Sequence, residues 1–292
     1  MKSSAKNYGF GLLLVLPAMA VFTLFIYYPF IQSLYYSFTE WDSIRDPKFI
    51  GFDNYIYFFQ DSKMMQGAKN TIWMTLFGLL IQNPLALLLA VLLNRSFRTK
   101  AFLRTAFYLP VIVSLVVASV VWNSILQFDG VLNYILTHIG QEQAARDWLG
   151  NIRTVFPVIV LLTQWQALGY CAVIYLAGLQ SIPADLYEAS TIDGAGPFMK
   201  FRYITFPLLM PAVTVVVFIT IVGGLRLFDL PYVLTNGGPG TASYTLTLAI
   251  YNAAFKEFTY GYATAAGVVL MIIIMIVTFA QLRLTRSREV EL

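Results

Sequence analysis

The sequence has very little charge, and this scarcity sets the class of protein. Of its 292 residues, only 12% are Asp, Glu, Lys or Arg, whereas 58% are hydrophobic. Soluble domains carry roughly 25% charged residues. The mean hydropathy of +0.69 points the same way. The composition therefore excludes a soluble globular domain and predicts a membrane protein.

The residues that usually build catalytic and metal centres are also scarce. The chain has one histidine, His138, and one cysteine, Cys171. It contains no Cys/His cluster, no HExxH motif and no GxxxxGK[ST] phosphate-binding loop. We interpret His138 as a solvated loop residue and Cys171 as a small packing residue in an apolar helix. We predict no catalytic residue, no metal site and no cofactor bound by this chain.

Six long stretches of the chain are apolar and almost free of charge. A helix needs about 20 apolar residues to cross the hydrocarbon core of a bilayer. Backbone groups in lipid must be hydrogen-bonded within the segment, and the alternation typical of β-barrel strands is absent. We therefore predict an all-α polytopic membrane protein, built as a single transmembrane domain, with a short amphipathic helix in segment 127–153. The expected spans are 10–31, 70–93, 105–126, 155–179, 206–229 and 260–283.

The positive charges predict the orientation in the membrane. Lys and Arg accumulate in cytoplasmic loops. Here the two ends of the chain and the loops around Arg98 and Lys200 hold most of them, whereas the other loops are richer in Asp and Glu. Both termini are therefore expected in the cytoplasm, together with loop 180–203. The isoelectric point near 9.0 follows from this bias, so it gives no reason to expect nucleic-acid binding.

A polar, glycine-containing segment, LYEASTIDGAGPFMKFRYITFPLLMP, lies within and after loop 180–203. Glu188, Ala189, Gly194, Ile204 and Pro207 have the spacing of the EAA loop of bacterial ABC importer permeases, which this segment resembles. The family usually has Ala at position 190 and Leu at position 206, where this chain has Ser and Phe. The resemblance implies a coupling element that docks on an ATPase subunit, which would bind ATP and Mg²⁺. The alternative is an ordinary amphipathic inner loop. The coupling residues implied by the resemblance are Glu188, Ala189, Ser190, Asp193, Gly194 and Ala195.

A second segment, RLFDLPYVLTNGGPG, runs from Arg226 to Gly240. Its Phe228, Asp229, Tyr232 and Gly-Gly-Pro positions resemble a motif at the outer end of the fifth core helix of carbohydrate permeases. Together the two segments resemble the first permease subunit of a heterodimeric importer of the maltose, oligosaccharide or glycerol-phosphate type. That resemblance implies a bacterial inner or plasma membrane location. The implied partners are a second homologous permease, two ATPase subunits, an extracytoplasmic substrate-binding protein, a carbohydrate and membrane lipid.

Polar side chains within the spans are candidates for the substrate path. Arg226 and Asp229 are three residues apart and are expected on one helical face, either as a self-neutralised pair or along the path. Sugars are bound by planar hydrogen-bonding side chains and by aromatic rings. For single residues the alternative is interhelical hydrogen bonding, worth about 0.6 kcal/mol on average. The remaining candidates are Gln164, Gln166, Tyr170, Asn123 and Phe228.

Two other classes of function compete with an importer subunit. A secondary transporter or channel would need ionisable relays or filter-like segments in the membrane, and only Arg226 and Asp229 are available. A membrane-embedded enzyme would need clustered acidic, His or Cys groups at membrane depth, and the sequence has none. The composition thus favours a permease that performs no chemical step.

Overall fold

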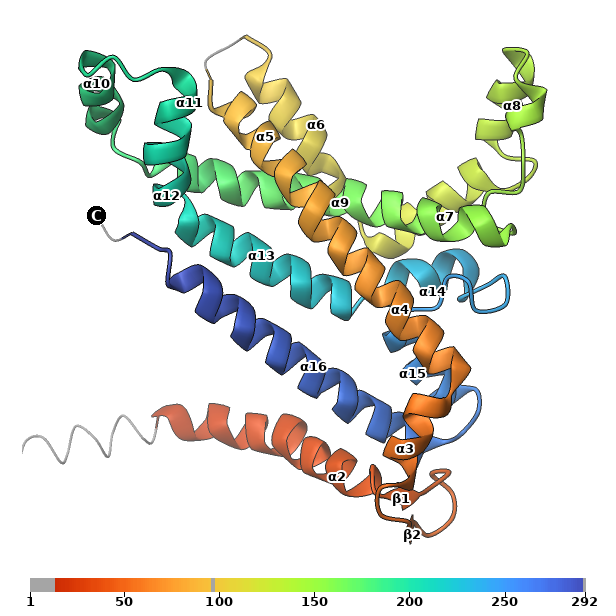
Figure 1. Cartoon of the computed structure of the whole chain (residues 1–292). Helices are drawn as coiled ribbons and strands as arrows, with labels where there is room; N and C mark the ends of the chain where they lie inside the picture. The colour runs from red at the N-terminus through yellow and green to blue at the C-terminus, as the bar shows by residue number, and fades with distance from the viewer. Residues whose placement is uncertain (1–13, 96–97, 291–292) are drawn as a thin grey trace, which may run out of the picture. The chain divides into compact units, whose positions relative to one another are not determined.

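The computed structural model describes residues 14–95 and 98–290. These residues are almost entirely helical, and six helices are long and apolar enough to cross a membrane (Figure 1). In the described part, the only strands are β1 (Thr39–Glu40) and β2 (Lys48–Phe49), which pair antiparallel. The predicted all-α polytopic class is confirmed. The first four residues of the expected span 10–31 lie outside the described residues.

The chain divides into two compact units. The first comprises the described residues of Met1–Asp61 together with Ile250–Val269, and the second comprises Ser62–Ala249 and the described residues of Leu270–Leu292. Helices α15 (Leu246–Phe255) and α16 (Tyr260–Arg286) contribute residues to both.

The first unit contains one apolar span and a small polar cap. The span runs over Leu14–Tyr36 and includes η1 (Thr23–Tyr27) and α2 (Tyr28–Tyr36); the hairpin and α3 (Asp53–Gln60) follow. The Asn54 side chain donates to the carbonyls of Ser37 and Thr39, at 3.0 and 2.9 Å, which ties α3 to the hairpin. The span ends five residues later than expected, because its last turn is uncharged and continues the helix.

The hairpin of the first unit carries an exposed acidic turn. The backbone N–H groups of Arg45 and Ile44 donate to the Asp42 carboxylate, at 2.8 and 3.0 Å. These bonds stabilise the ionised form and hold the pKa of Asp42 below its ordinary value. Ile44 itself projects away from the protein and is 87% exposed.

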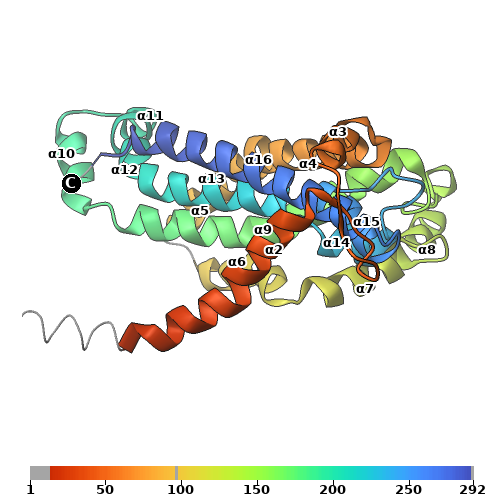
Figure 2. The same ribbon diagram turned by 90° about the horizontal axis from the view of Figure 1, so that it is seen from below.

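The second unit holds most of the helices, and in it α9 (Ile152–Gln180) and α13 (Met210–Leu225) lie side by side (Figure 2). Its longest helix, α9, has 29 residues and packs against α4, α5, α6, α13 and α14. The elements of this unit, other than α15 and α16, are α4 (Ser62–Phe77), η2 (Gly78–Gln82), α5 (Asn83–Asn94), α6 (Lys100–Ile112), α7 (Leu115–Leu126), α8 (Val131–His138), η3 (Glu142–Ala144), α9 (Ile152–Gln180), α10 (Ala184–Ile192), α11 (Pro197–Lys200), η4 (Phe201–Thr205), α12 (Phe206–Leu208), α13 (Met210–Leu225) and α14 (Asp229–Thr235).

Small residues let α9 approach its neighbours closely. Ala86 and Ala90 of α5 are fully buried in a core that includes Ala172 of α9. At Gly169, a Cβ atom would lie 1.9 Å from the carbonyl oxygen of Phe107 on α6, so only glycine fits there. Such contacts are typical of membrane helices, which associate by close packing rather than by expulsion of water.

The expected span 105–126 is not one continuous helix. It is replaced by α6 and α7, which are separated at Val113 and Ser114, where the backbone is extended. Gln166 of α9 donates to the carbonyls of Pro110 and Val113, at 3.4 and 3.2 Å. These bonds partly satisfy backbone carbonyls that the break leaves without a helical partner. The second span also differs, since α4 begins at Ser62 rather than at residue 70.

The expected span 206–229 ends early, and this corrects the expected pairing of Arg226 with Asp229. Helix α13 ends at Leu225, and α14 begins anew at Asp229. A continuous helix would bring the ring of Pro231 against the carbonyl of Leu227; that carbonyl instead accepts from the Thr245 hydroxyl at 2.7 Å. Arg226 and Asp229 therefore do not share a helical face. Both are exposed, and no ion pair joins them among the contacts of the described residues.

The amphipathic helix predicted in segment 127–153 is confirmed as α8. Loop 180–203 contains two short helices, α10 and α11, which are separated at Gly194 and Gly196. Helices α8 and α10 lie at opposite ends of α9 (Figure 1). Because α9 rises about 1.5 Å per residue, it is long enough to separate two sides of a membrane.

Candidate transport cavity and coupling loop

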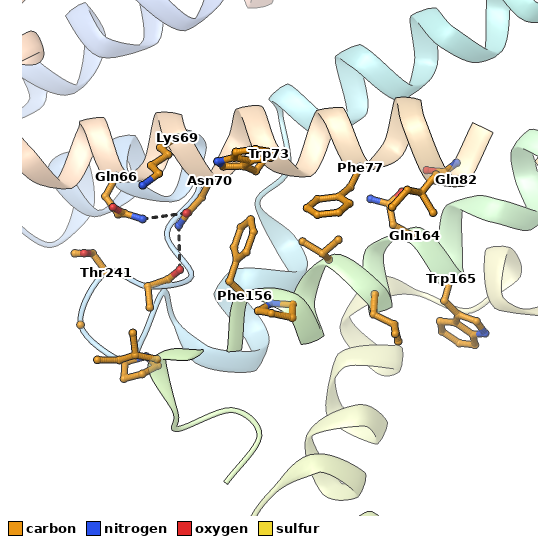
Figure 3. A pocket seen from close by; sticks show the side chains of 18 of the residues that line it. Gln66, Lys69, Asn70, Trp73, Phe77, Gln82, Phe156, Gln164, Trp165 and Thr241 are labelled. Atoms are coloured by element: carbon orange, nitrogen blue, oxygen red, sulfur yellow. Dashed lines mark hydrogen bonds between the residues drawn. The ribbon is translucent and has the colours of Figure 1, made fainter. Parts of the chain in front are cut away.

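A cavity of about 1210 Å³ lies in the second unit, between α4 and α9 (Figure 3). The loop after α14 lies at one end of the cavity, which is the outer end in the orientation expected from the positive charges, and η2 and α5 contribute to the opposite, inner end. Its lining residues are Gln66, Lys69, Asn70, Trp73, Phe77, Ile81, Gln82, Leu85, Ile152, Phe156, Pro157, Val160, Leu161, Gln164, Trp165, Leu168, Pro239, Gly240, Thr241 and Ala242.

The outer end of the cavity is polar and held by hydrogen bonds. The Asn70 amide donates to the carbonyls of Ala242 and Tyr244, at 3.0 and 2.8 Å, and Gln66 donates to Asn70 at 3.0 Å (Figure 3). Because Asn70 is buried, these bonds fix the loop against α4. Lys69 is the charged residue among those that line the cavity.

The middle of the cavity is aromatic. Trp73 and Phe77 of α4 face Phe156 of α9 across it, and Trp165 lies further along α9 (Figure 3). The rings of Trp73 and Phe77 are 6.3 Å apart and tilted by 41°. Aromatic faces of this kind suit a ligand that presents flat C–H surfaces between hydroxyl groups.

The inner end carries amide side chains beside a π-helix. Segment η2 immediately precedes Asn83 and Pro84, and a proline at this point conflicts with the carbonyl of residue 80 in a regular α-helix. The wider π turn accommodates this conflict, and π segments often occur at functional sites. The Gln82 amide donates to the sulfur of Cys171 at 3.0 Å, and the Asn83 amide donates to the Thr220 hydroxyl at 3.2 Å.

Gln164 differs from its polar neighbours because its carbonyl oxygen is buried and has no hydrogen-bond partner in the described structure. An unsatisfied buried polar group costs about 1–3 kcal/mol. Gln164 is one of the residues that line the cavity, and its buried oxygen lies near Gly78. A hydroxyl group that enters the cavity can pair with this oxygen only after the Gln164 side chain rotates toward the cavity.

The structure separates the candidates that sequence analysis had grouped together. Gln164 lines the cavity, whereas Gln166 braces the break between α6 and α7. Asn123 donates to the carbonyl of Leu234 at 3.4 Å. The other candidates, Tyr170, Arg226, Phe228 and Asp229, are not among the residues that line this cavity.

Several lining residues were missed by sequence analysis. Asn70 and Gln82 are polar residues close to or within an apolar span, so the criterion that selected Gln164 also applied to them. Trp73, near the start of the second expected span, also lines the cavity and was not among the candidates. Apolar periodicity gives no signal for it, because lipid and the interior of a bundle are equally apolar.

The loop at the other end of α9 forms a rigid projection. In it, Gly194 has a φ of +75° and follows α10, and the N–H of Ala195 returns to the carbonyl of Ser190 at 2.9 Å. This is the left-handed turn that glycine most readily adopts at the end of a helix. The hydroxyls of Tyr187 and Thr205 lie 2.9 Å apart and tie α10 to the start of the next span.

The coupling residues lie on the outside of this projection. Glu188, Ala189, Asp193 and Gly194 are exposed, and Ser190 and Ala195 are half-buried. Large apolar side chains are exposed beside them: Ile192 is 87% exposed, and Phe198, Met199 and Tyr203 are also exposed. Exposed apolar surfaces of this kind occur where another protein or lipid binds.

A family comparison decides the class of the protein. The family described as "Binding-protein-dependent transport system inner membrane component" matches residues 82–290. The chain belongs to this family. It is therefore a multi-pass membrane permease rather than an enzyme.

The chain is also similar, over nearly its whole length, to sugar permeases of several bacteria. The chain is 37% identical to the probable starch degradation products transport system permease protein AmyD of Thermoanaerobacterium thermosulfurigenes, over 100% of both chains. It is 32% identical to the multiple sugar-binding transport system permease protein MsmF of Streptococcus mutans, over 98% of this chain and 97% of the relative. It is also 32% identical to the lactose transport system permease protein LacF of Rhizobium radiobacter, over 99% and 98%.

A solved structure shares the fold. A chain of a bacterial ABC transporter involved in the import of the acidic polysaccharide alginate superposes with a TM-score of 0.85, at 25% identity and with 98% of both chains covered. The likeness extends over all six spans and both loops described above, because it covers nearly the whole chain.

Proposed function

We propose that this chain is the permease subunit of an ATP-driven, binding-protein-dependent importer for a sugar or oligosaccharide. The observation that carries the proposal is the pairing of two features in one unit: an aromatic and amide-lined cavity, and an exposed coupling loop at the inner end of the same helix, α9. The names of the full-length relatives support carbohydrate as the substrate class.

The cavity forms one wall of the translocation path in this proposal. Trp73, Phe77 and Phe156 offer ring faces to the C–H surfaces of a sugar, and Gln66 and Gln164 offer amide groups to its hydroxyls. Both kinds of contact are weak enough to release the substrate inward. A second, homologous permease would provide the opposite wall, and an extracytoplasmic binding protein would deliver the sugar.

The coupling loop receives force from an ATPase subunit. Helix α10 is short, exposed and pinned at its base by the bond between Tyr187 and Thr205, so a push on it is transmitted to the adjoining spans. Two ATPase subunits would bind ATP and Mg²⁺ and carry out the hydrolysis. This arrangement requires loop 180–203 and both termini to lie in the cytoplasm, as the distribution of Lys and Arg predicts.

The proposal is tested by placing a charge on the docking surface. Ile192→Asp should abolish co-purification of the ATPase subunits, because a carboxylate would be desolvated at an apolar contact. Ile44→Asp is a matched control, since Ile44 and Ile192 are both 87% exposed and Ile44 lies in the predicted outer hairpin. We expect Ile44→Asp to retain the ATPases.

Two results would contradict the proposal. One is equal retention of the ATPases by both variants. The other is recovery of the chain as a homodimer that transports substrate along an ion gradient without any ATPase, which would favour the secondary-transporter alternative.

A further inference from the structure

The segment between α7 and α9, which is expected on the outer side, is held in one conformation by hydrogen bonds. Asn133 lies at its centre and is 5% exposed. Its amide donates to the carbonyls of Phe128 and Arg146, both at 2.8 Å, and its carbonyl accepts from the N–H of Arg146 and from the indole of Trp148 at 2.9 Å. These four bonds use both donors and the acceptor oxygen of one side chain, so they hold α8 in a fixed orientation.

Helix α8 turns one apolar face outward. Its inward face carries Asn133 and Leu132, and Leu132 packs against the core around α7 and α9. The outward face is exposed, lacks any Asp, Glu, Lys or Arg side chain and follows helical spacing of three and four residues. It consists of Val131, Tyr134, Ile135, His138 and Ile139, with Phe128 just before the helix. His138, which sequence analysis placed in a loop, is the last residue of α8, and its ring packs on Tyr134 with the ring centroids 3.9 Å apart.

This outward face continues an exposed apolar stripe of α7. Val117, Val120 and Val121 are exposed on α7, and the same spacing leads through Ser124 to Phe128. Helix α8 then turns sharply away from the direction of α7 (Figure 1). Helix α8 is therefore not a straight continuation of α7, although the two together form one apolar stretch, Leu115–His138.

The charges around α8 lie where lipid headgroups would be. Asp129 precedes the helix, and Glu142, Arg146 and Asp147 follow it, all exposed. Charged residues thus flank an apolar face, which is the distribution expected of a helix that lies in the membrane interface with its apolar side toward the acyl chains.

We propose that α8 is an interfacial helix whose outward face, from Phe128 to Ile139, rests in the headgroup and acyl boundary of the outer leaflet. Lipid fits this face better than a binding protein that docks and leaves, because the face is continuous with the exposed apolar stripe of α7. The contact fixes the depth of the outer end of α7 and α9, beside the cavity. It does not depend on which substrate is carried.

The experiment measures the collision rates of nitroxide spin labels in the assembled transporter in lipid nanodiscs. Labels are attached at Ile135→Cys and, separately, at Ile139→Cys, with Ile44→Cys as an equally apolar control in the hairpin. The native Cys171 is buried, so it should remain unlabelled. We expect molecular oxygen to relax the labels at 135 and 139 more than a water-soluble nickel chelate does, and the reverse at 44.

Two outcomes would overturn the proposal. If the nickel chelate dominates at both 135 and 139, the face is in water. If both labels are shielded from oxygen and nickel alike, a protein subunit covers the face instead of lipid, and repeating the measurement without the binding protein shows whether that protein is the one that covers it. Two labelled positions are used so that a local disturbance at one of them does not decide the result.

Discussion

Replacement of Gly194 by valine should impair coupling without unfolding the membrane domain. At this position φ is +75°, and a Cβ atom would meet nothing within 4 Å. The substitution therefore causes no steric clash with neighbouring residues, and its cost is the backbone strain of a left-handed conformation. That strain is about 1–2 kcal/mol for an L-residue. It corresponds to a factor of roughly 5–30 in the population of the observed turn.

A neighbouring glycine provides the control. Gly196 also has nothing within 4 Å of its Cβ position, but its φ is −72°, which valine adopts without strain. Gly196→Val should therefore cost less than Gly194→Val, apart from the weak preference for glycine before a helix. Gly194→Asn should recover part of the lost activity, because asparagine tolerates the left-handed region.

The assay is sugar uptake per ATP hydrolysed in proteoliposomes that hold the complete transporter, with the binding protein supplied. We expect Gly194→Val to lower this ratio, Gly194→Asn to lie between it and the native chain, and Gly196→Val to remain near native. The thermal unfolding of all three should be similar, because the turn is outside the packed core. Equal ratios for the two valine variants would refute the reasoning from φ.

Two further predictions concern α9. Gly169→Ala should lower the stability of the solubilised protein by about 1–3 kcal/mol, the usual cost of overpacking, because the new Cβ atom would clash with the Phe107 carbonyl. The control, Gly223→Ala, should leave the stability unchanged, because its Cβ would meet nothing within 4 Å. Equal shifts in the unfolding temperature of the two variants would contradict this account. Gln164→Leu should reduce uptake with no loss of thermal stability, since it removes an unpartnered carbonyl. Gln166→Leu should instead lower thermal stability, since it removes the hydrogen bonds to two carbonyls at the α6–α7 break. An equal loss of thermal stability in Gln164→Leu and Gln166→Leu would show that Gln164 is a structural residue too.

Much of the fold could be predicted because charge is so costly in lipid. The six spans follow from stretches that lack Lys, Arg, Asp and Glu, and the coupling helices follow from Gly194, Gly196 and Pro197, which set the turn between them. The break between α6 and α7 could not be predicted in this way. Val113 and Ser114 are uncharged, and the break is supported by Gln166, which is more than fifty residues away in sequence.

The end of α13 was open to prediction but was missed. Pro231 lies four residues after Leu227, and a proline in that position kinks or breaks a helix. We expected Arg226 and Asp229 on one face because the helix was expected to continue to residue 229. Hydropathy reports whether a residue can reside in lipid, whereas the local backbone depends on which carbonyls and N–H groups are available.

The polar residues of the spans show how bracing residues differ from residues that can serve the path. Asn70, Asn83 and Gln166 all have hydrogen bonds to carbonyls or hydroxyls of neighbouring segments, so their amides stabilise the fold. Gln164 lines the cavity, and its buried carbonyl has no partner among the described residues, so a rotation of the side chain toward a bound hydroxyl group would remove the cost of the unsatisfied carbonyl. The sequence shows that all four side chains are amides, but it does not show which of them lacks a hydrogen-bond partner. That distinction depends on the packing of α4, α9 and α13, and it is the reason that Gln164, rather than Gln166, is the residue on which we base the substrate path.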